Sequence, residues 1–272
     1  MSETDGHPPE PLKHLLPQHL DDLRRSGLSD EQIAACKFLS LNDAKRIDRL
    51  LGWKVSEKGV TCGLAIPFPG DDGKLNGYGR LKPDKPRLSP KDGAPVRYES
   101  PKGKTNRAYF PPGTLAALGD PSVPLVITEG EKKAAKGDQE GFRTIGLTGV
   151  FGWQKKQKDK DAPKELIPDL EAVAWKGRAV FLTYDSDLAD KPDVAHAEWR
   201  LAEVLTAKGA TVKVTRLPAG PDGVKVGLDD YLVAHGPDDF RQALEAAQPP
   251  AKPSSRVGSR HSSAFVGKAA CC

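Results

Sequence analysis

Acidic side chains follow two apolar runs of this sequence, at the point where each run ends. The run Leu125–Thr128 is followed by Glu129, and the run Val180–Tyr184 is followed by Asp185 and Asp187. Asp185 and Asp187 are two positions apart, so an extended chain points both side chains to the same side. Three carboxylates brought together would repel one another and raise each other's pKa unless a cation lay between them. Oxygen ligands of this kind suit Mg²⁺ or Mn²⁺, which in turn bind phosphate oxygens.

The same acids also have a purely structural interpretation. The glutamate after the first run would favour the start of a helix, and the two aspartates would make a turn after a strand. For one acid alone this interpretation is the better one, but two acidic groups placed directly after buried-type strands favour a site. Lys132 and Lys133 lie in a helix opened by Gly130, where they could reach a phosphate from the same side or be surface lysines.

The elements that must position these acids alternate between strand and helix after residue 121. Strands are predicted at 123–128, 144–147, 178–184 and 211–217. Helices are predicted from about 131 and over 193–208, 228–234 and 238–247. Such alternation is typical of a mostly parallel sheet with helices on both faces. Ligands of such sheets gather beyond the carboxyl ends of the strands, which is where the acids are expected.

The rest of the chain divides into three further regions, which differ in composition and in the secondary structure that they predict. Residues 1–58 are predicted to be helical, with Ser29 and Gln32 in the spacing of a capping box. Residues 59–120 form a small β-rich region with strands predicted at 63–68 and 75–81. The α/β domain is predicted to cover 121–248, and the Pro-, Ser- and Gly-rich residues 249–272 are predicted to be a disordered tail.

Charge is unevenly distributed along the chain. The net charge is +4, but four basic residues of the tail account for it, so residues 1–248 are neutral. The segment Lys74–Arg107 nevertheless contains ten basic residues against three acids. A solvated loop face is one explanation, and a surface that binds nucleic acid is the other. On the second explanation we expect basic residues of this segment, Lys82 among them, to contact nucleic acid or nucleotide.

The cysteines and the apolar runs exclude several classes of protein. The four cysteines lack the paired spacing of a zinc ribbon and follow no secretory leader, so reduced thiols in a cytoplasm are expected. The longest apolar runs fall far short of the roughly 20 residues that a helix needs to cross a bilayer. No membrane segment is therefore predicted.

The two acidic motifs carry a family resemblance. Glu129-Gly130 after one strand and Asp185-x-Asp187 after another resemble the toprim signature shared by topoisomerases, bacterial primases and certain nucleases. Upstream, three motifs resemble the bacterial primase core in content and order; they are Ile66–Phe68, Gly73–Arg80 and Arg97–Pro101. Glu129–Ala134, followed by Gly149–Trp153, also resembles a divergent toprim branch of plasmid and phage replication proteins.

The resemblance implies a fold and a site. The fold would be a toprim-like, mostly parallel sheet with flanking helices, preceded by a small α+β primase-like subdomain. Glu129, Asp185 and Asp187 would hold Mg²⁺ or Mn²⁺, and Asp229 would be an auxiliary acid. Arg80 and Arg97 would contact phosphates of the template or nucleotide, with Lys132 and Lys133 nearby.

The leading functional hypothesis is primase-like nucleotidyl transfer, in which primers are made from nucleoside triphosphates on single-stranded DNA during replication of a plasmid or phage. A replicative helicase or polymerase would be the partner. Two alternatives remain open because no zinc-ribbon module and no helicase-binding domain are evident. One is a toprim-type nuclease with the same metal centre, and the other is a non-catalytic DNA-binding accessory protein.

Overall fold

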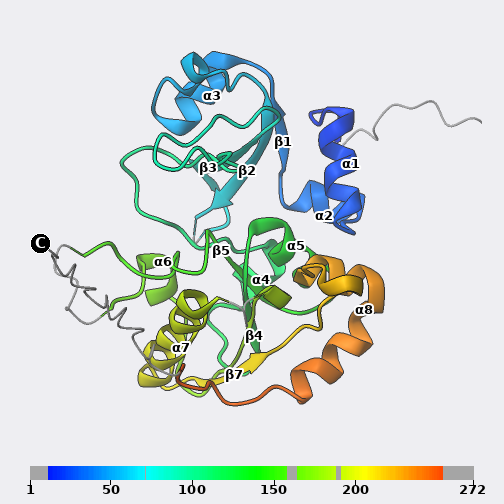
Figure 1. The fold of residues 1–272 in the computed structure, drawn as a ribbon, viewed down its shortest axis with the longest axis vertical. Coiled ribbons are helices and arrows are strands. Elements are labelled where there is room, and N and C mark those ends of the chain that lie inside the picture. Colours follow the sequence, from blue (N-terminus) through cyan, green and yellow to red (C-terminus); the bar gives the residue numbers. More distant parts are fainter. Residues whose placement is uncertain (1–11, 71, 158–163, 188–190, 254–272) are drawn as a thin grey trace, which may run out of the picture.

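Two sheets with attached helices make up the chain (Figure 1). The computed structural model describes residues 12–70, 72–157, 164–187 and 191–253. The antiparallel sheet has the strand order β1–β2–β3, with β1 at Leu39–Leu41, β2 at Gly63–Pro69 and β3 at Leu75–Pro83. In the register of this sheet Ala65 pairs with Leu39 on one side and with Leu81 on the other.

Strand β1 corrects the prediction for the first 58 residues, which are otherwise largely helical. The helical elements are α1 (Pro17–Arg25), α2 (Asp30–Ala35), α3 (Ala44–Leu51) and the 3-10 turn η2 (Val55–Lys58). The three residues of β1 pair with the edge of β2. This is a tertiary contact, and local periodicity in the sequence does not predict it.

The predicted capping box is half formed. The Ser29 hydroxyl accepts a hydrogen bond from the Gln32 N–H at 3.2 Å, as expected for an N-cap. The Gln32 side chain does not reach back to Ser29 and instead donates to the Ala135 carbonyl at 3.0 Å. The prediction of a reciprocal box is therefore wrong, because Gln32 binds a helix 100 residues away.

The second sheet is entirely parallel, which confirms the predicted fold class. Its strand order is β5–β4–β6–β7, with β4 at Leu125–Glu129, β5 at Thr144–Leu147, β6 at Ala179–Thr183 and β7 at Thr211–Thr215. The helices of this part are α4 (Pro112–Ala117), α5 (Glu131–Gln139), α6 (Pro168–Glu171), α7 (Pro192–Ala207) and α8 (Leu228–Glu245), with a 3-10 turn η4 (Pro221–Gly223). The two helical segments predicted near the end both lie within α8, where the non-helical backbone of Gly236 (φ 79°, ψ 177°), ahead of Pro237, separates them.

Alternate residues of the central strand β4 face different cores, as the pleat of a strand requires. Leu125 and Ile127 pack in a cluster with Leu201 of α7. Val126 packs in another cluster with Leu232 of α8. Helices therefore cover both faces of the parallel sheet, as predicted.

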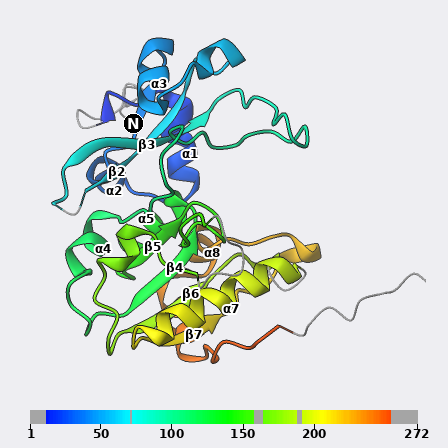
Figure 2. The ribbon, with the colours of Figure 1, turned by 90° about the vertical axis from the view of Figure 1, so that its left-hand side faces the viewer.

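Helix α5 also joins the parallel sheet to the N-terminal part (Figure 2). Its Ala134 and Ala135 are buried in the same cluster as Leu20 and Leu23 of α1 and Phe68 of β2. Small side chains on this face allow the helix to approach the antiparallel sheet closely. The N-terminus of α5 is thereby fixed between the two sheets.

The predicted domain boundaries remain predictions, and the predicted disorder of the tail concerns mainly residues outside the described ranges. Among the described helices, none is long and apolar enough to span a bilayer.

One buried arginine holds the start of β6 against the turn before β4. Arg178 is fully buried and donates to the carbonyls of Ala174, Val123 and Leu118 at 2.7–2.8 Å. A further bond of 3.2 Å reaches the carbonyl of Ala117. Burial lowers the pKa of this guanidinium.

We expect Arg178→Met to lower the free energy of unfolding by about 3 kcal/mol, because four buried or half-buried backbone carbonyls lose the guanidinium as a hydrogen-bond donor. Urea unfolding followed by circular dichroism measures the change. Arg200→Met, on the exposed side of α7, is the control and should stay within about 0.5 kcal/mol of the parent protein. Equal effects of the two substitutions would contradict this role for Arg178.

Candidate functional site

The carboxyl ends of β4 and β6 lie side by side and carry the predicted acids. In the parallel register Ile127 of β4 pairs with Leu182 of β6, so Glu129 and Asp185 both follow at the same edge of the sheet. Gly130 lies between β4 and α5 with a φ of 101°, a conformation that favours glycine and turns the chain sharply into the helix. The sheet therefore delivers the acids to one edge, as the sequence predicted.

A cavity of about 480 Å³ opens at this edge, between the two sheets. Its acidic lining residues are Glu129, Glu131, Asp185 and Asp229. Its basic lining residues are Arg80, Arg97, Lys132, Lys133 and Lys225. Seven of the nine residues named from the sequence line this one cavity, and the two that do not are Lys82 and Asp187.

Asp185 is buried and neutralised by two lysines. The Lys133 ammonium contacts one carboxylate oxygen, and the Lys225 Nζ lies 2.7 Å from the other. Ser186, next in the chain, donates its N–H to the Val226 carbonyl at 3.0 Å, and its hydroxyl accepts from the Val226 N–H at 2.9 Å. These bonds tie the end of β6 to the segment that carries Lys225.

Lys225 is a counter-ion shared by all three predicted metal ligands. Burial lowers the pKa of its ammonium, but the hydrogen bond and charge of Asp185, with the charges of Asp187 and Glu129, outweigh burial and raise the pKa. Asp187 lies 3.7 Å from the Lys225 Nζ and 2.5 Å from the Lys191 Nζ, and the bond to Lys191 lowers the pKa of Asp187. The Lys225 ammonium group therefore supplies positive charge of the kind that the clustered acids require.

Sequence reasoning missed Lys225. This lysine lies in a loop more than 35 residues after the second acidic motif, and nothing in its local pattern separates it from a surface residue. The only signal available was its position shortly before Asp229, in a segment already named for its resemblance.

Two buried polar atoms of the cavity lack hydrogen bonds among the described residues, and they belong to Asp229 and Thr148. Asp229 is the second residue of α8, and its Oδ1 is one of these atoms. Burial and the charge of Asp230 raise its pKa, although Lys133 and Lys132 act in the opposite direction. The Thr148 hydroxyl, after β5, is the other atom. A ligand in this cavity would find both an oxygen ligand and a hydroxyl ready to bind.

Arg80 connects the antiparallel sheet to the start of α5. Its Nη1 lies 2.5 Å from an oxygen of Glu131, a carboxylate that is only 1% exposed. Its Nε donates to the Ser100 hydroxyl at 3.1 Å, and its guanidinium lies 4.9 Å from the ring centre of Tyr98. Arg80 thus lines the cavity but is committed to a protein partner.

Arg97 is exposed and reaches the same cavity from a loop. Leu81 of β3 exchanges two backbone hydrogen bonds with Glu99, at 3.0 and 2.8 Å. This short bridge places the loop beside β3, and Arg97 and Arg80 both line the cavity. No ion pair of Arg97 is found among the described residues.

Lys82 pairs with helix α1 and does not line the cavity. Its ammonium contacts both oxygens of Asp22 in α1, at 2.8 and 2.7 Å, and Lys132 contacts Asp22 at 3.2 Å. Burial would raise the pKa of Asp22, but the two lysines outweigh burial and lower it. Lys82 therefore lies outside the cavity, although the sequence had grouped it with Arg80 and Arg97, which line the cavity.

The donor set of the cavity suits a hard divalent cation, but the three predicted ligands are not arranged around one point. Among the described residues, one group of three His, Cys, Asp or Glu side chains has its ligand atoms within 4.8 Å of one another, and Glu129, Asp185 and Asp187 are not that group. The Glu129 side chain makes no hydrogen bond or ion pair with the described residues, and the Oδ1 atom of Asp229 has no hydrogen-bond partner among them. A divalent ion at Asp185 would have to displace lysine.

Solved structures with similar folds are bacterial primase cores. The DnaG catalytic core is 17% identical with a TM-score of 0.55, and the alignment covers 88% of this chain and 75% of that one. The zinc-binding and RNA polymerase domains of the Aquifex aeolicus primase are 13% identical with a TM-score of 0.55, covering 85% of this chain and 56% of that one. A DnaG catalytic domain bound to single-stranded DNA gives 17% and 0.54, covering 88% of this chain and 74% of that one. The chain has the fold of a primase catalytic core.

Sequence comparisons add a family model and one curated relative. A model described as a domain of unknown function (DUF3854) matches residues 116–239, which include the parallel sheet and all four predicted acids. An uncharacterized protein of Picosynechococcus sp. is 29% identical over 194 residues, covering 60% of this chain and 19% of that protein. The chain thus spans about a fifth of the length of this relative.

The buried carboxyl of Asp229 gives a pH-dependent prediction. An acid whose pKa is raised by folding binds its proton more tightly in the folded state, so stability falls as pH rises from the unfolded pKa, about 3.9, through the folded pKa. An asparagine at this position cannot ionise, so the variant Asp229→Asn does not lose stability in this way as pH rises. In EDTA we expect the variant to match the parent protein below about pH 4 and to be more stable at pH 7, by about 1.4 kcal/mol for each unit of pKa shift. Urea unfolding at both pH values tests this, and a difference independent of pH would refute it.

Proposed function

We propose that this protein is a primase-like nucleotidyltransferase that joins nucleotides on single-stranded DNA with the help of Mg²⁺ or Mn²⁺. The observation that carries the proposal is the cavity between the two sheets. Carboxylates from the ends of β4, β6 and the start of α8 meet guanidinium and ammonium groups from β3, its following loop and α5 there. Phosphoryl transfer needs this combination of hard oxygen ligands and positive charge.

Each group in the cavity has a role in this proposal. Glu129, Asp185 and Asp229 are the oxygen ligands, with Asp187 at the edge. A bound Mg²⁺ or Mn²⁺ would neutralise the phosphates of a nucleoside triphosphate and align them with a 3′-hydroxyl. Lys133 and Lys225, released from Asp185, would then hold phosphate oxygens.

The exposed basic loop after β3 is the proposed path of the template. Arg97 lines the cavity and is exposed, so it can bind a phosphate without breaking an ion pair among the described residues. Exposed Lys102 and Lys104 continue the positive surface along the same loop. Binding through such contacts releases counter-ions and weakens steeply with salt. A solved DnaG catalytic domain of the same fold was bound to single-stranded DNA, which supports this choice of template.

Replication of a plasmid or phage, together with a helicase or polymerase partner in a cytoplasm, belongs to the same proposal. It is supported by the resemblance of Glu129–Ala134 to a toprim branch of such replication proteins and by thiols that are free at Cys36 and Cys62.

One observation favours a second candidate, a DNA-binding accessory protein without catalysis. Both oxygens of Asp185 are bound by lysine, which neutralises the acid without a metal. In this case the lysines would remain in place and the cavity would bind DNA or nucleotide through Arg97 alone. The assay below separates the two functions.

The proposal predicts that Glu129→Gln and Asp185→Asn each lower primer synthesis by about 100-fold or more, because each removes a ligand for a charge-neutralising ion. Labelled nucleoside triphosphates, a single-stranded DNA template and Mn²⁺ or Mg²⁺ provide the assay, and products are sized on a gel. Glu203→Gln, an exposed acid on α7, is the matched control and should leave synthesis unchanged.

Three outcomes of this assay are informative. If the parent protein makes short labelled oligomers and neither variant does, the result supports synthesis. If the parent protein shortens the template strand and neither variant does, the result indicates a nuclease instead. DNA binding without either product, unchanged by Asp185→Asn, would leave the accessory function.

Replacement of the shared counter-ion gives a separate prediction. Lys225→Met removes a positive charge from Glu129, Asp185 and Asp187, so Mn²⁺ should bind roughly tenfold more tightly to the variant than to the parent protein. Calorimetry or the electron paramagnetic resonance signal of free Mn²⁺ measures the affinity. Lys208→Met, which removes a surface pair with Glu171, is the control. Equal Mn²⁺ affinity in all three proteins would place the ion away from these acids.

A further inference from the structure

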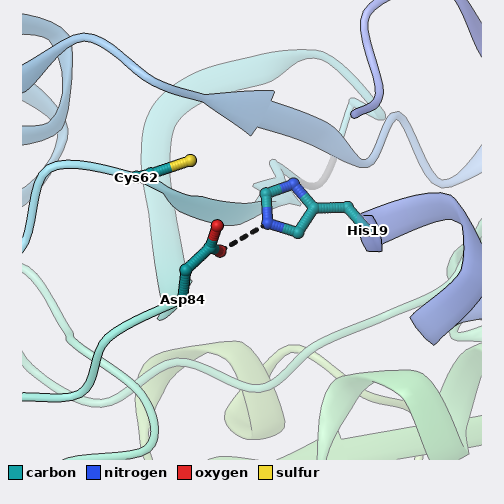
Figure 3. Close-up of side chains that lie close together, drawn as sticks. All are labelled: His19, Cys62 and Asp84. Carbon is teal, nitrogen blue, oxygen red and sulfur yellow. Dashed lines mark hydrogen bonds and ion pairs between the residues drawn. The ribbon is translucent and has the colours of Figure 1, made fainter. Parts of the chain in front are cut away.

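A second group of potential metal ligands lies outside the cavity, where α1 contacts the antiparallel sheet. His19 comes from α1, Cys62 directly precedes β2, and Asp84 directly follows β3. Figure 3 shows the three side chains approaching one another from these separate segments. The imidazole, the thiol and the carboxylate offer ligand atoms that all lie within 4.8 Å of one another, which no other such trio among the described residues does.

The three ligand atoms are close enough to move onto one zinc ion. Zinc bonds measure about 2.3 Å to sulfur and roughly 2.0–2.2 Å to nitrogen and oxygen, so ligand atoms at tetrahedral angles around one ion are about 3.3–3.6 Å apart. The ligand atoms of the trio all lie within 4.8 Å of one another, so side-chain shifts of about 1 Å would bring them to this spacing. A thiolate with an imidazole and a carboxylate is a donor set that favours zinc over Mg²⁺ or Ca²⁺.

The imidazole is already oriented by a second hydrogen bond. The Nδ1 atom of His19 lies 2.6 Å from the oxygen of the Ser40 hydroxyl, and this oxygen accepts a hydrogen bond from the Leu16 N–H at 2.7 Å. This leaves Nε2 directed at Asp84, 2.6 Å away. Metal-binding histidines are held in this way, with one ring nitrogen fixed by an outer partner and the other on the ion.

The other two ligands are held by the sheet. The Asp84 N–H donates to the Cys62 carbonyl at 3.1 Å, which continues the antiparallel pairing of Gly63 with Pro83 by one step. Both side chains are therefore fixed by the same strand register. His19 is 5% exposed, whereas the Asp84 side chain is 29% exposed, so an ion can enter from the Asp84 side.

We propose that His19, Cys62 and Asp84 bind a zinc ion that fastens α1 to the antiparallel sheet, with a fourth position open to water. The competing interpretation is a hydrogen-bonded link alone, in which the His19 ring donates to Asp84 and no metal enters. The two interpretations differ in whether the thiol of Cys62 is required for metal binding.

Cobalt is the probe that tests the proposal without relying on any variant of the site. The full chain is prepared free of metal with Cys271→Ser and Cys272→Ser, so that the terminal thiols do not bind the probe. Titration with Co²⁺ should give an intense thiolate-to-cobalt absorption in the near ultraviolet and the strong visible bands of tetrahedral cobalt, both saturating at one equivalent of thiolate-bound cobalt; Co²⁺ held by the carboxylates of the cavity would add no thiolate absorption. Zn²⁺ should then displace the Co²⁺ and abolish these bands.

Variants in the same background assign the ligands. Cys62→Ser should abolish the thiolate absorption, and His19→Gln should abolish the tetrahedral bands. Ser40→Ala should weaken binding by about tenfold, because it removes the hydroxyl that orients the His19 ring. Cys36→Ala and His14→Gln are the matched controls, since they remove a thiol and an imidazole that do not belong to the trio, and they should leave the spectrum unchanged. Zn²⁺ should also raise the melting temperature of the parent protein and of the controls, but not that of Cys62→Ser.

The proposal is overturned if the parent protein binds no Co²⁺ with a thiolate absorption. It is equally overturned if Cys62→Ser, shown to be folded by circular dichroism, binds zinc as tightly as the parent protein. Neither result bears on nucleotide transfer, because the trio and the cavity share no residue.

Discussion

The ion pair between Arg80 and Glu131 is the contact on which the arrangement of the two sheets depends. Arg80 belongs to β3 and Glu131 to the first turn of α5, and their side chains are 11% and 1% exposed. A carboxylate buried to this degree is costly unless a cation is paired with it, so the two elements must meet here. Ala134 and Ala135, one turn further along α5, then pack into the N-terminal core. The cavity is the space that remains beside this junction.

Within the cavity, charge balance is the second constraint. Acids at the ends of β4 and β6 and at the start of α8 would destabilise one another, and Lys133 and Lys225 provide the compensating charge. Lys133 can approach Asp185 because position 227 is a glycine: a Cβ there would lie 2.6 Å from the Lys133 Cε. The same lysines that stabilise the folded protein are also placed to bind phosphate. Stability and the proposed catalysis therefore compete for the same ammonium groups.

Helix α1 links the trio of His19, Cys62 and Asp84 to the rim of the cavity. Helix α1 contributes His19 to the trio, and its Asp22 pairs with Lys132 at the rim of the cavity. Fastening α1 to the sheet through an ion would thus hold Asp22 in position against α5. The N-terminal helix is part of the frame of the site, although no residue of α1 lines the cavity.

The sequence by itself determined the parallel sheet, the order of its elements and the placement of Glu129 and Asp185 at one edge. Strand and helix periodicity are local properties, and parallel strands share one carboxyl edge, so these conclusions need no knowledge of packing. Only the tertiary structure decided that Lys225 serves the acids, that Arg80 binds Glu131, that Lys82 turns to Asp22, and that His19 meets Cys62 and Asp84. These pairings join residues about 40 to 95 positions apart. Strand register and helix packing fix them, and neither leaves a periodic signal in the chain.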